Sequence, residues 1–413
     1  MLSGLRGVRL LDDGVADVRI AGAVVVDPSG AGDAAGKSAG VVLDATSWRL
    51  VPGPVEPHAH LDKALTAGRI PPGAGLDLVG AVESWRALAP GIDAADVRHR
   101  ALAALRRYLA RGFTGVRTHV NLDAGGDPLA AVRVLVGLRE ELREVLTLQV
   151  CLLPSERADD ALIRDAIALG PDALGGCPHL AADPRAETGR LLDLAQESGL
   201  PLDLHTDEQV DPGSLDLLDL AHEVLRRDLR TPVTASHCVR LGSLEPARLA
   251  EVLDVVGRAG VAVVGLPQTN LYLQGWDATH LVPRGITAAR ALLDAGITFG
   301  AGGDNLRDPF NPVGRADPFE TASLLVAGAH LRPREALDAV TAGARAATGM
   351  PVAGTDTGDE ASFVLVPDSD LGDVVAGTHD ARVVVHRGRV VADTRVASSL
   401  ALDTTHPTPT PGR

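Results

Sequence analysis

Aromatic side chains are scarce in this sequence of 413 residues, which contains five Phe, three Trp and two Tyr. A core of ordinary size must therefore be built from Leu, Val, Ile and Ala. Apolar residues still make up 45% of the chain and charged residues 23%, as is usual for a globular protein. This composition excludes a disordered or collagen-like chain, and it makes any aromatic residue beside a chemical motif notable.

Cysteine and basic charge are also in short supply. The three cysteines are scattered and form no CxxC pair, which argues against a disulfide scaffold or a thiolate zinc site and fits a reducing compartment. Lys and Arg number 39 against 54 Asp and Glu, a net charge of −15, which disfavours nucleic acid or an anionic membrane as a partner. The sequence shows no signal-peptide pattern and no long apolar run. We therefore expect a soluble cytoplasmic protein.

Short apolar runs divide the chain into three parts. Residues 1–51 are typical of β-strands with Gly and Asp turns, and residues 352–398 show the same pattern. Neither segment has enough strands to bury a stable face alone, so we expect the two to pair in one small β-sandwich module. Residues 399–413, which are rich in Pro and Thr, are expected to form a flexible tail.

Residues 52–351 alternate strand-like runs with helical stretches. This alternation predicts parallel βαβ units, and eight of them predict a (β/α)8 barrel of the TIM type, whose catalytic groups lie at the C-terminal ends of the strands. The eight expected strands are VPGPVEPHAH, FTGVRTHV, LTLQVCLL, ALGGCPHL, LPLDLHTD, VTASHC, AGVAVVGLP and ITFGAGGD.

Metal-ligating residue types fall at these strand ends. His58 and His60 are two residues apart on a strand, so both rings point to the same face. His205, His237 and Asp304 end three other expected strands, which would bring all five side chains to one mouth of the barrel. Three imidazoles and a carboxylate suit zinc or ferrous iron, and such an ion lowers the pKa of bound water to about 7. The residues therefore predict metal-assisted hydrolysis.

Several motifs resemble, in order and spacing, those of the amidohydrolase superfamily, and within it the group of cytosine deaminase and N-isopropylammelide isopropylamidohydrolase. The motifs extend over nearly the whole chain and are HAHLDK, RTHV, LQV, LHTDE, TASH, PQTNLYLQG, RGIT and GGDNLRDPFNPVG. The resemblance implies one divalent metal ion, zinc or iron. Its implied ligands are His58, His60, His205 and Asp304. A second ion would need a bridging lysine at a strand end, and the sequence has no lysine at such a position. A single metal ion is therefore expected.

The resemblance also implies catalytic roles. Asp304 would take a proton from the attacking water, and His237 would act as a base or an electrostatic stabiliser. Glu208 would protonate a ring nitrogen and pass the proton to the leaving amine, although a solvated loop carboxylate is its alternative reading. His119 and His179 are expected to have structural roles.

Substrate contacts are implied for three further residues near these motifs. Gln149 would bind the carbonyl-amide edge of a ring or, alternatively, tie two strands together. Lys63 would donate to a ring carbonyl oxygen or pair with Asp62. Trp85 would form a hydrophobic lid over the site.

Two positions depart from the cytosine deaminase pattern. Asn305 stands where those enzymes have an aspartate, which favours a substrate carbonyl or an N-substituted ring over a bare amino group. Phe310 stands near the position of a bulkier indole and leaves more space for substrate.

Together these features predict a mononuclear metal-dependent aminohydrolase, a deaminase acting on a pyrimidine, purine, s-triazine or creatinine-like ring. One alternative is a hydrolase that opens a cyclic amide, and another is a catalytically silent barrel that binds a heterocycle. Analogy with other barrel hydrolases leaves self-association open.

Overall fold

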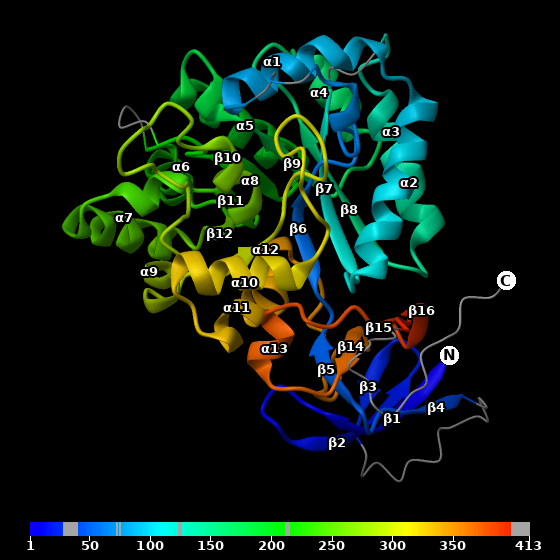
Figure 1. The fold of residues 1–413 in the computed structure, drawn as a ribbon. Coiled ribbons are helices and arrows are strands. Elements are labelled where there is room, and N and C mark those ends of the chain that lie inside the picture. Colours follow the sequence, from blue (N-terminus) through cyan, green and yellow to red (C-terminus); the bar gives the residue numbers. More distant parts are fainter. Residues whose placement is uncertain (28–39, 72, 74–75, 123–125, 211–214, 398–413) are drawn as a thin grey trace, which may run out of the picture.

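The computed structural model of the chain describes residues 1–27, 40–71, 73, 76–122, 126–210 and 215–397. Figure 1 shows two parts, a barrel surrounded by helices above and a β-sheet module below. The tail expected over residues 399–413 lies outside the described residues.

Eight parallel strands form the barrel, in the order in which they occur in the chain. They are β6 (Val55–Ala59), β7 (Gly115–Asn121), β8 (Thr147–Leu153), β9 (Ala173–Gly176), β10 (Leu202–Thr206), β11 (Val233–His237), β12 (Ala262–Gly265) and β13 (Phe299–Ala301). A parallel bridge between Ala59 and Asp304 joins the first and last strand regions. Seven of the strands lie within the expected runs and β7 extends one residue past its run, so the predicted barrel is confirmed.

Helices follow the strands and cover the barrel, and several begin at an aspartate. The carboxylates of Asp77, Asp93, Asp159, Asp183 and Asp317 each accept a backbone N–H of the first turn, which satisfies a donor that the helix leaves unpaired. The helices before and around the barrel are α1 (Leu78–Leu88), α2 (Ala94–Ala110), α3 (Ala130–Leu142), α4 (Asp160–Ile167), α5 (Pro184–Ser198), α6 (Asp216–Arg227), α7 (Pro246–Ala259), α8 (Pro267–Leu273), α9 (Ala289–Asp294), α10 (Pro318–Ala329), α11 (Pro333–Val340) and α12 (Ala342–Thr348).

The flanking segments form one eight-stranded mixed sheet, as expected for a composite module. Its strands are β1 (Leu2–Arg9), β2 (Val15–Ala21), β3 (Val24–Val26), β4 (Val41–Asp44), β5 (Trp48–Pro52), β14 (Phe363–Pro367), β15 (Arg382–His386) and β16 (Arg389–Thr394), with α13 (Leu371–Val375) between β14 and β15. The two segments meet where β5 pairs with β14 in antiparallel register. Leu5, Ile20, Leu50, Phe363 and Val385 from both segments share one core.

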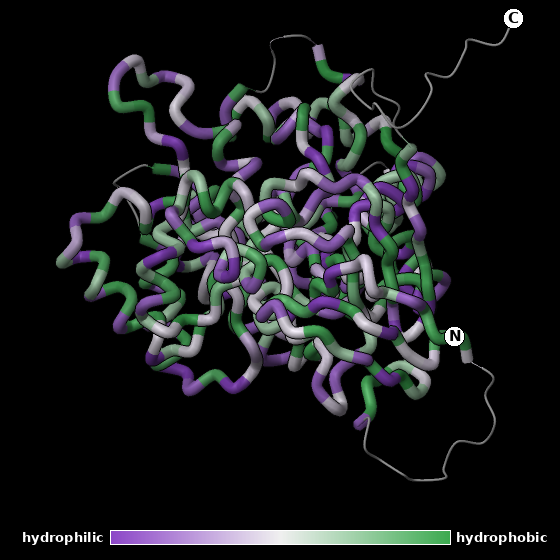
Figure 2. The backbone as a smooth tube through the Cα atoms, turned by 60° about the horizontal axis from the view of Figure 1, so that its bottom comes forward, coloured by the Kyte–Doolittle hydropathy of each residue, from purple (hydrophilic) through white to green (hydrophobic). Residues whose placement is uncertain are grey.

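The core and surface follow the composition. The large barrel core consists mainly of Leu, Val and Ala side chains, and Trp85, Tyr108, Phe113, Phe299 and Phe319 are its aromatic members. Polar and apolar residues alternate every few positions along the helices in Figure 2. No helix among the described residues is long and apolar enough to cross a membrane.

The open end of the barrel faces away from the sheet module. In Figure 1, β6 runs from β5 towards the far end of the barrel, and α1 lies across that end. The helix α1 therefore covers the end of the barrel at which the strands have their C-terminal ends.

Candidate functional site

Four of the predicted side chains meet at this end of the barrel. Nε2 of His58 lies 3.0 Å from Nε2 of His205, which lies 3.3 Å from Nε2 of His60. Oδ1 of Asp304 lies 3.3 Å from Nε2 of His60 and 3.9 Å from Nε2 of His58. His58 lies on β6, His60 directly follows that strand, His205 lies on β10 and Asp304 follows β13. All four side chains are buried. We call them the His/Asp cluster.

Burial sets the protonation of this cluster. It lowers the pKa of each of the three imidazoles well below 6.5 and raises the pKa of the Asp304 carboxyl well above its usual range. Neutral imidazoles have a ring-nitrogen lone pair available for a ligand. A cation among them would favour the ionised carboxylate.

The cluster has the size and donor set of a metal site. Bonds of about 2.0–2.1 Å to a tetrahedral ion place neighbouring donors roughly 3.3 Å apart, close to the separations between these atoms. Oδ1 of Asp304 is buried without a hydrogen-bond partner, as are Nδ1 of His58 and Nδ1 of His205. Three nitrogens and one oxygen with an unsatisfied carboxylate atom therefore fit a divalent transition metal.

His237 lies beside the cluster at the end of β11. Its Nδ1 is 3.1 Å from Oδ1 of Asn270, and its Nε2 is 3.9 Å from Oδ2 of Asp304 and has no hydrogen-bond partner. Burial lowers the pKa of the ring. With Nδ1–H donated to Asn270, the lone pair of Nε2 points to the site. His237 and Asp304 both have positive φ, 73° and 66°, an uncommon conformation that often occurs at functional sites.

Glu208 is held between two histidines. Its Oε2 lies 3.3 Å from Nε2 of His179, and its Oε1 lies 3.8 Å from Nδ1 of His237. Burial acts to raise the pKa of Glu208, but the charge of His237 and the hydrogen bond and charge of His179 lower it overall. Nδ1 of His179 lies 3.1 Å from the carbonyl oxygen of His205, so a proton on that atom is donated to the backbone.

Lys63, Trp85 and Phe310 form one wall of the site. Nζ of Lys63 lies 5.5 Å from the ring centre of Trp85 and 5.8 Å from that of Phe310, within the range of cation–π attraction. The same Nζ is 3.0 Å from Nδ1 of His60 but 4.0 Å from Oδ2 of Asp62. Lys63 therefore faces the site more closely than it faces Asp62.

Asn305 lines the site, but other residues already hold its amide. Nδ2 donates to Oδ2 of Asp308 at 2.8 Å, and the hydroxyl of Thr269 donates to Oδ1 at 3.3 Å. One N–H of the amide stays available to a substrate, because a carboxamide carries two.

Gln149 does not reach the site, so its predicted substrate contact is corrected. Its Oε1 accepts from Nε of Arg117 at 3.0 Å, and its Nε2 donates to the carbonyl oxygen of Thr348 at 3.2 Å. The reason is register, since Gln149 is the third residue of β8 and lies partly exposed near the N-terminal end of the strand, whereas the site is at the C-terminal end. It ties strands together, the alternative that the sequence left open.

Two histidines that are expected to have structural roles lie beside the His/Asp cluster and Glu208. His119 stacks on His58 with ring centres 3.9 Å apart, and its Nε2 is 3.6 Å from Oδ2 of Asp203. His179 contacts Glu208, as described above. His119 ends the expected strand FTGVRTHV and His179 follows the expected strand beginning at Ala173, so their strand-end positions were the available signal.

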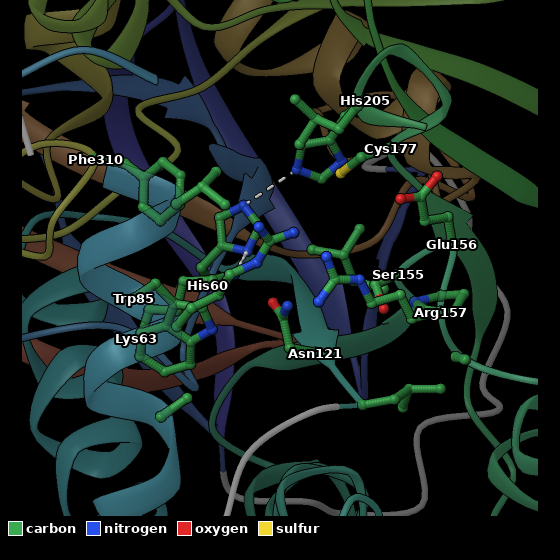
Figure 3. Close-up of a pocket in the computed structure, with 18 of the residues that line it drawn as sticks. His60, Lys63, Trp85, Asn121, Ser155, Glu156, Arg157, Cys177, His205 and Phe310 are labelled. Carbon is green, nitrogen blue, oxygen red and sulfur yellow. Dashed lines mark hydrogen bonds between the residues drawn. The ribbon is translucent and has the colours of Figure 1, made fainter. Parts of the chain in front are cut away.

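A cavity of about 480 Å³ opens above the His/Asp cluster. Its inner end holds His60, His205, His237, Glu208 and Asp304. Its outer walls come from α1 and from the loop after β8, including Pro154, Ser155, Glu156 and Arg157. Figure 3 shows Trp85 and Phe310 on one side, Ser155 and Arg157 on the opposite side, and Asn121 between them. A cavity of this size suits a ligand larger than a single small ring.

Comparison with known proteins gives consistent matches. A family model described as "Amidohydrolase family" matches residues 73–392. The chain is 32% identical over 388 residues to a pterin deaminase of Rhizobium rhizogenes strain K84, a match that covers 91% of this chain and 87% of that protein.

Solved structures are similar over nearly the full length. The structure of 5-methylcytosine deaminase from Klebsiella pneumoniae liganded with 5-fluorocytosine is 26% identical, covers 96% of this chain and 99% of its own, and has a TM-score of 0.86. N-isopropylammelide isopropylaminohydrolase from Burkholderia multivorans is 30% identical, covers 94% of this chain and 98% of its own, and has a TM-score of 0.79.

Proposed function

This chain belongs to the amidohydrolase family, and from that membership we propose that it is a metal-dependent aminohydrolase. In this proposal it replaces an exocyclic amine of a small nitrogen heterocycle by water. One observation carries the proposal: the His/Asp cluster, Glu208 and His237 converge at the inner end of one cavity. A catalytically silent barrel has no physical need for ligands, acid and base together.

The proposed ligands of one divalent ion are His58, His60, His205 and Asp304. Zinc or iron at this position supplies Lewis acidity and a water whose pKa falls to about 7. His119 supports the site by stacking on His58 from below.

We assign the proton transfers from the side-chain atoms that face the site. Oδ2 of Asp304 and Nε2 of His237 lie 3.9 Å apart, so both can act on a water between them, as proton acceptor and as hydrogen-bond partner. Glu208 and His179 are close enough to share one proton, which Glu208 delivers to a ring nitrogen. Asp304 then returns the first water proton to the leaving amine, and the hydroxyl proton of the tetrahedral intermediate passes to Glu208 as the carbonyl forms. The amine departs neutral, and both carboxyl groups regain their starting protonation states.

Substrate recognition is assigned to the cavity wall. The rings of Trp85 and Phe310 face a flat heterocycle, and Nζ of Lys63 donates to a ring carbonyl oxygen. The remaining N–H of Asn305 donates to a second acceptor on the ring. Pterin, 5-methylcytosine and N-isopropylammelide are named as substrates of the similar proteins, and all three are flat nitrogen heterocycles that carry an exocyclic amine.

The test is an amine-release assay on the purified protein together with metal analysis. The panel contains pterin, cytosine, 5-methylcytosine, isoguanine, creatinine, ammelide and N-alkyl ammelides. We expect close to one zinc or iron per chain and release of ammonia or an alkylamine from at least one ring. Removal of the ion with a chelator should abolish this release, and adding zinc or iron back should restore it.

Two outcomes contradict the proposal. A fully active protein without metal would rule out the assigned ligands. A product with a new carboxylate and no free amine would identify a ring-opening amidohydrolase, because ring opening of a cyclic amide keeps the nitrogen in the product.

A further inference from the structure

We propose that the outer half of the cavity is an anion subsite, which binds a carboxylate or similar anionic substituent of the heterocycle. Its donors are the guanidinium groups of Arg157 and Arg86 and the indole N–H of Trp85. The inference rests on the proposed function, because it places the reacting ring at the His/Asp cluster and the substituent at the outer end.

Arg157 supplies the first donor. It follows β8 in the loop before α4, and its guanidinium makes no hydrogen bond or ion pair within the described part of the chain. Figure 3 shows its side chain reaching into the cavity from the side opposite Trp85 and Phe310. Arg157 is exposed, as are Arg164 and Arg185, but those two arginines are paired, Arg164 with Glu197 at 2.9 Å and Arg185 with Asp219 at 2.7 Å.

Arg86 supplies the second donor from the other wall. It stands on α1 next to Trp85 and lines the same cavity. Its guanidinium likewise has no hydrogen-bond or ion-pair partner among the described residues. Two unpaired guanidinium groups at one cavity mouth attract an anion, because a carboxylate can accept two parallel N–H bonds from each.

The neighbouring carboxylate does not neutralise this pair. Glu156 lines the outer cavity, but its Oε2 accepts the backbone N–H of Ala182 at 2.8 Å. In Figure 3 its carboxylate points away from the guanidinium of Arg157. The outer end therefore keeps a positive charge although the chain as a whole is acidic.

Two buried polar atoms on the cavity wall also lack partners. Trp85 is only 2% exposed, and its Nε1–H makes no hydrogen bond. Oδ1 of Asn121, which lines the same cavity between Trp85 and Arg157 in Figure 3, is buried and unpaired as well. Buried polar groups are rarely left unsatisfied, so both atoms point to a ligand that accepts from the indole and offers a donor to the amide.

The charges along the cavity fix the orientation of such a ligand. At the inner end the carboxylates of Glu208 and Asp304 offset the charges of Lys63 and the proposed metal ion, whereas at the outer end Arg157 and Arg86 are unpaired and attract an anion. Between them the walls are apolar, with Leu122, Leu153, Leu162, Leu180 and Val82. These surfaces fit a flat heterocycle whose exocyclic amine lies at the inner end of the cavity and whose anionic substituent lies at the outer end.

The experiment compares the same ring with and without a carboxylate. The probe pairs are pterin with pterin-6-carboxylate and cytosine with 5-carboxycytosine. Ammonia release gives kcat/KM for the metal-loaded enzyme, and calorimetry gives Kd for the Glu208→Gln variant, so binding is measured without turnover. We expect the carboxylated member of at least one pair to be preferred by roughly tenfold or more in both measurements.

Substitutions identify the groups responsible. Arg157→Ala and Arg86→Ala should each lower the ratio of carboxylated to neutral kcat/KM by roughly tenfold, and Arg157→Lys should retain part of it. Arg106→Ala is the matched control. This substitution removes the same charge, but Arg106 is exposed on α2 and is absent from the cavity wall.

The outcomes separate the two proposals. If neutral rings release ammonia but neither measurement favours the carboxylated member, the anion subsite is wrong and the aminohydrolase proposal stands. If no ring releases ammonia but the carboxylated member binds more tightly and Arg157→Ala removes that preference, the subsite stands and the aminohydrolase proposal fails. A ratio unchanged in both Ala variants overturns the subsite, as does a failure of every probe to bind.

Discussion

At the scale of single residues, the site depends on side chains whose partners fix one atom and leave another free. Asn270 holds Nδ1 of His237, which leaves Nε2 free beside Asp304. His179 and the barrel wall hold Glu208 close to the same point. In the proposed mechanism such partners orient the reacting groups before substrate arrives, which lowers the free energy needed to reach the transition state.

Glu208→Gln tests the proposed proton carrier. The amide cannot hold and release a proton, so kcat should fall by roughly two to four orders of magnitude on the best substrate of the panel. The metal content should stay unchanged, since Glu208 is not an assigned ligand. Glu251→Gln on the exposed surface of α7 is the control. Normal turnover by Glu208→Gln would show that the acid has been misassigned.

Glu56→Ala tests how the cluster is held. The buried carboxylate of Glu56 accepts the backbone N–H of Gly303 at 2.9 Å and that of His58 at 3.3 Å, so it joins the two segments that carry ligands. Its loss should weaken metal binding by roughly 10–100-fold, as for other groups that orient ligands.

The measurement for Glu56 is a competition titration with a metal chelator. Glu56→Gln keeps one acceptor oxygen and should bind metal with intermediate affinity. Equal affinity in the wild type and in Glu56→Ala would assign Glu56 a role in folding alone.

The sequence predicts some site residues and not others, for a physical reason. His58, His60, His205 and Asp304 could be placed because a strand end fixes where a side chain points. The substrate contact of Gln149 rested on the resemblance alone, although the expected run LTLQVCLL already continues past Gln149 to Leu153, where β8 ends. Contacts across the barrel, such as His179 with Glu208, depend on how strands pack and leave no local pattern.

At the scale of elements, α1 buries fewer residues than α2, the helix that follows it. Its buried residues are Leu78, Ala81 and Trp85, whereas α2 buries six residues along its length. Yet α1 contributes Trp85 and Arg86 to the cavity wall. An element with few buried contacts opens at low free-energy cost, so α1 is suited to admit and cover a ligand.

Asp77→Ala should therefore act on substrate binding. The carboxylate of Asp77 caps α1 by accepting the N–H of Gly80 at 2.8 Å, and loss of a cap costs about 1 kcal/mol. If this shifts α1 towards an open state, KM rises by at most about fivefold while the melting temperature changes little.

Asp93→Ala is the matched control for α1. Asp93 caps α2 in the same way, by accepting the N–H of Asp96 at 2.8 Å, but α2 is packed against the barrel. This variant should lower the melting temperature and leave KM unchanged. The opposite pattern in the two variants would show that α1 does not gate the cavity.

The order of strands and helices was predictable because it depends on patterns of neighbouring residues in the sequence. Eight apolar runs separated by helical stretches sufficed to predict eight parallel strands, and all eight are present. Which helix covers the open end could not be read from periodicity, because α1 and α2 have similar local patterns and differ only in what they pack against.

At the scale of the whole molecule, the sheet module holds a buried group of charges next to the barrel. His386 ends β15 and is fully buried near Glu360, Arg387 and Arg345. Burial lowers its pKa from 6.5 to about 4, an effect that the charges of both arginines increase and that of Glu360 opposes.

This shift predicts a loss of stability in acid. Between pH 6.5 and 4 the unfolded chain binds a proton on His386 that the folded protein does not, so the free energy of unfolding falls as the pH falls. From pH 7 to pH 5 the contribution of this residue is on the order of 2 kcal/mol. Urea unfolding at both pH values, on the wild type and on His386→Gln, measures it.

The control for this experiment is His99→Gln, at an exposed position on α2. His386→Gln should show a smaller loss between pH 7 and pH 5 than the wild type, whereas His99→Gln should match the wild type. An equal pH dependence in all three proteins would place the acid sensitivity elsewhere.

The pairing of β5 with β14 also bears on how the protein is made. These strands lie on opposite sides of the barrel in the sequence, so a ribosome must synthesise the whole barrel between them. At translation rates of 5–20 residues per second, β5 waits roughly 15–60 s for its neighbour to emerge. During that interval an apolar strand edge is exposed in the nascent chain, which makes the N-terminal segment a natural client for chaperones.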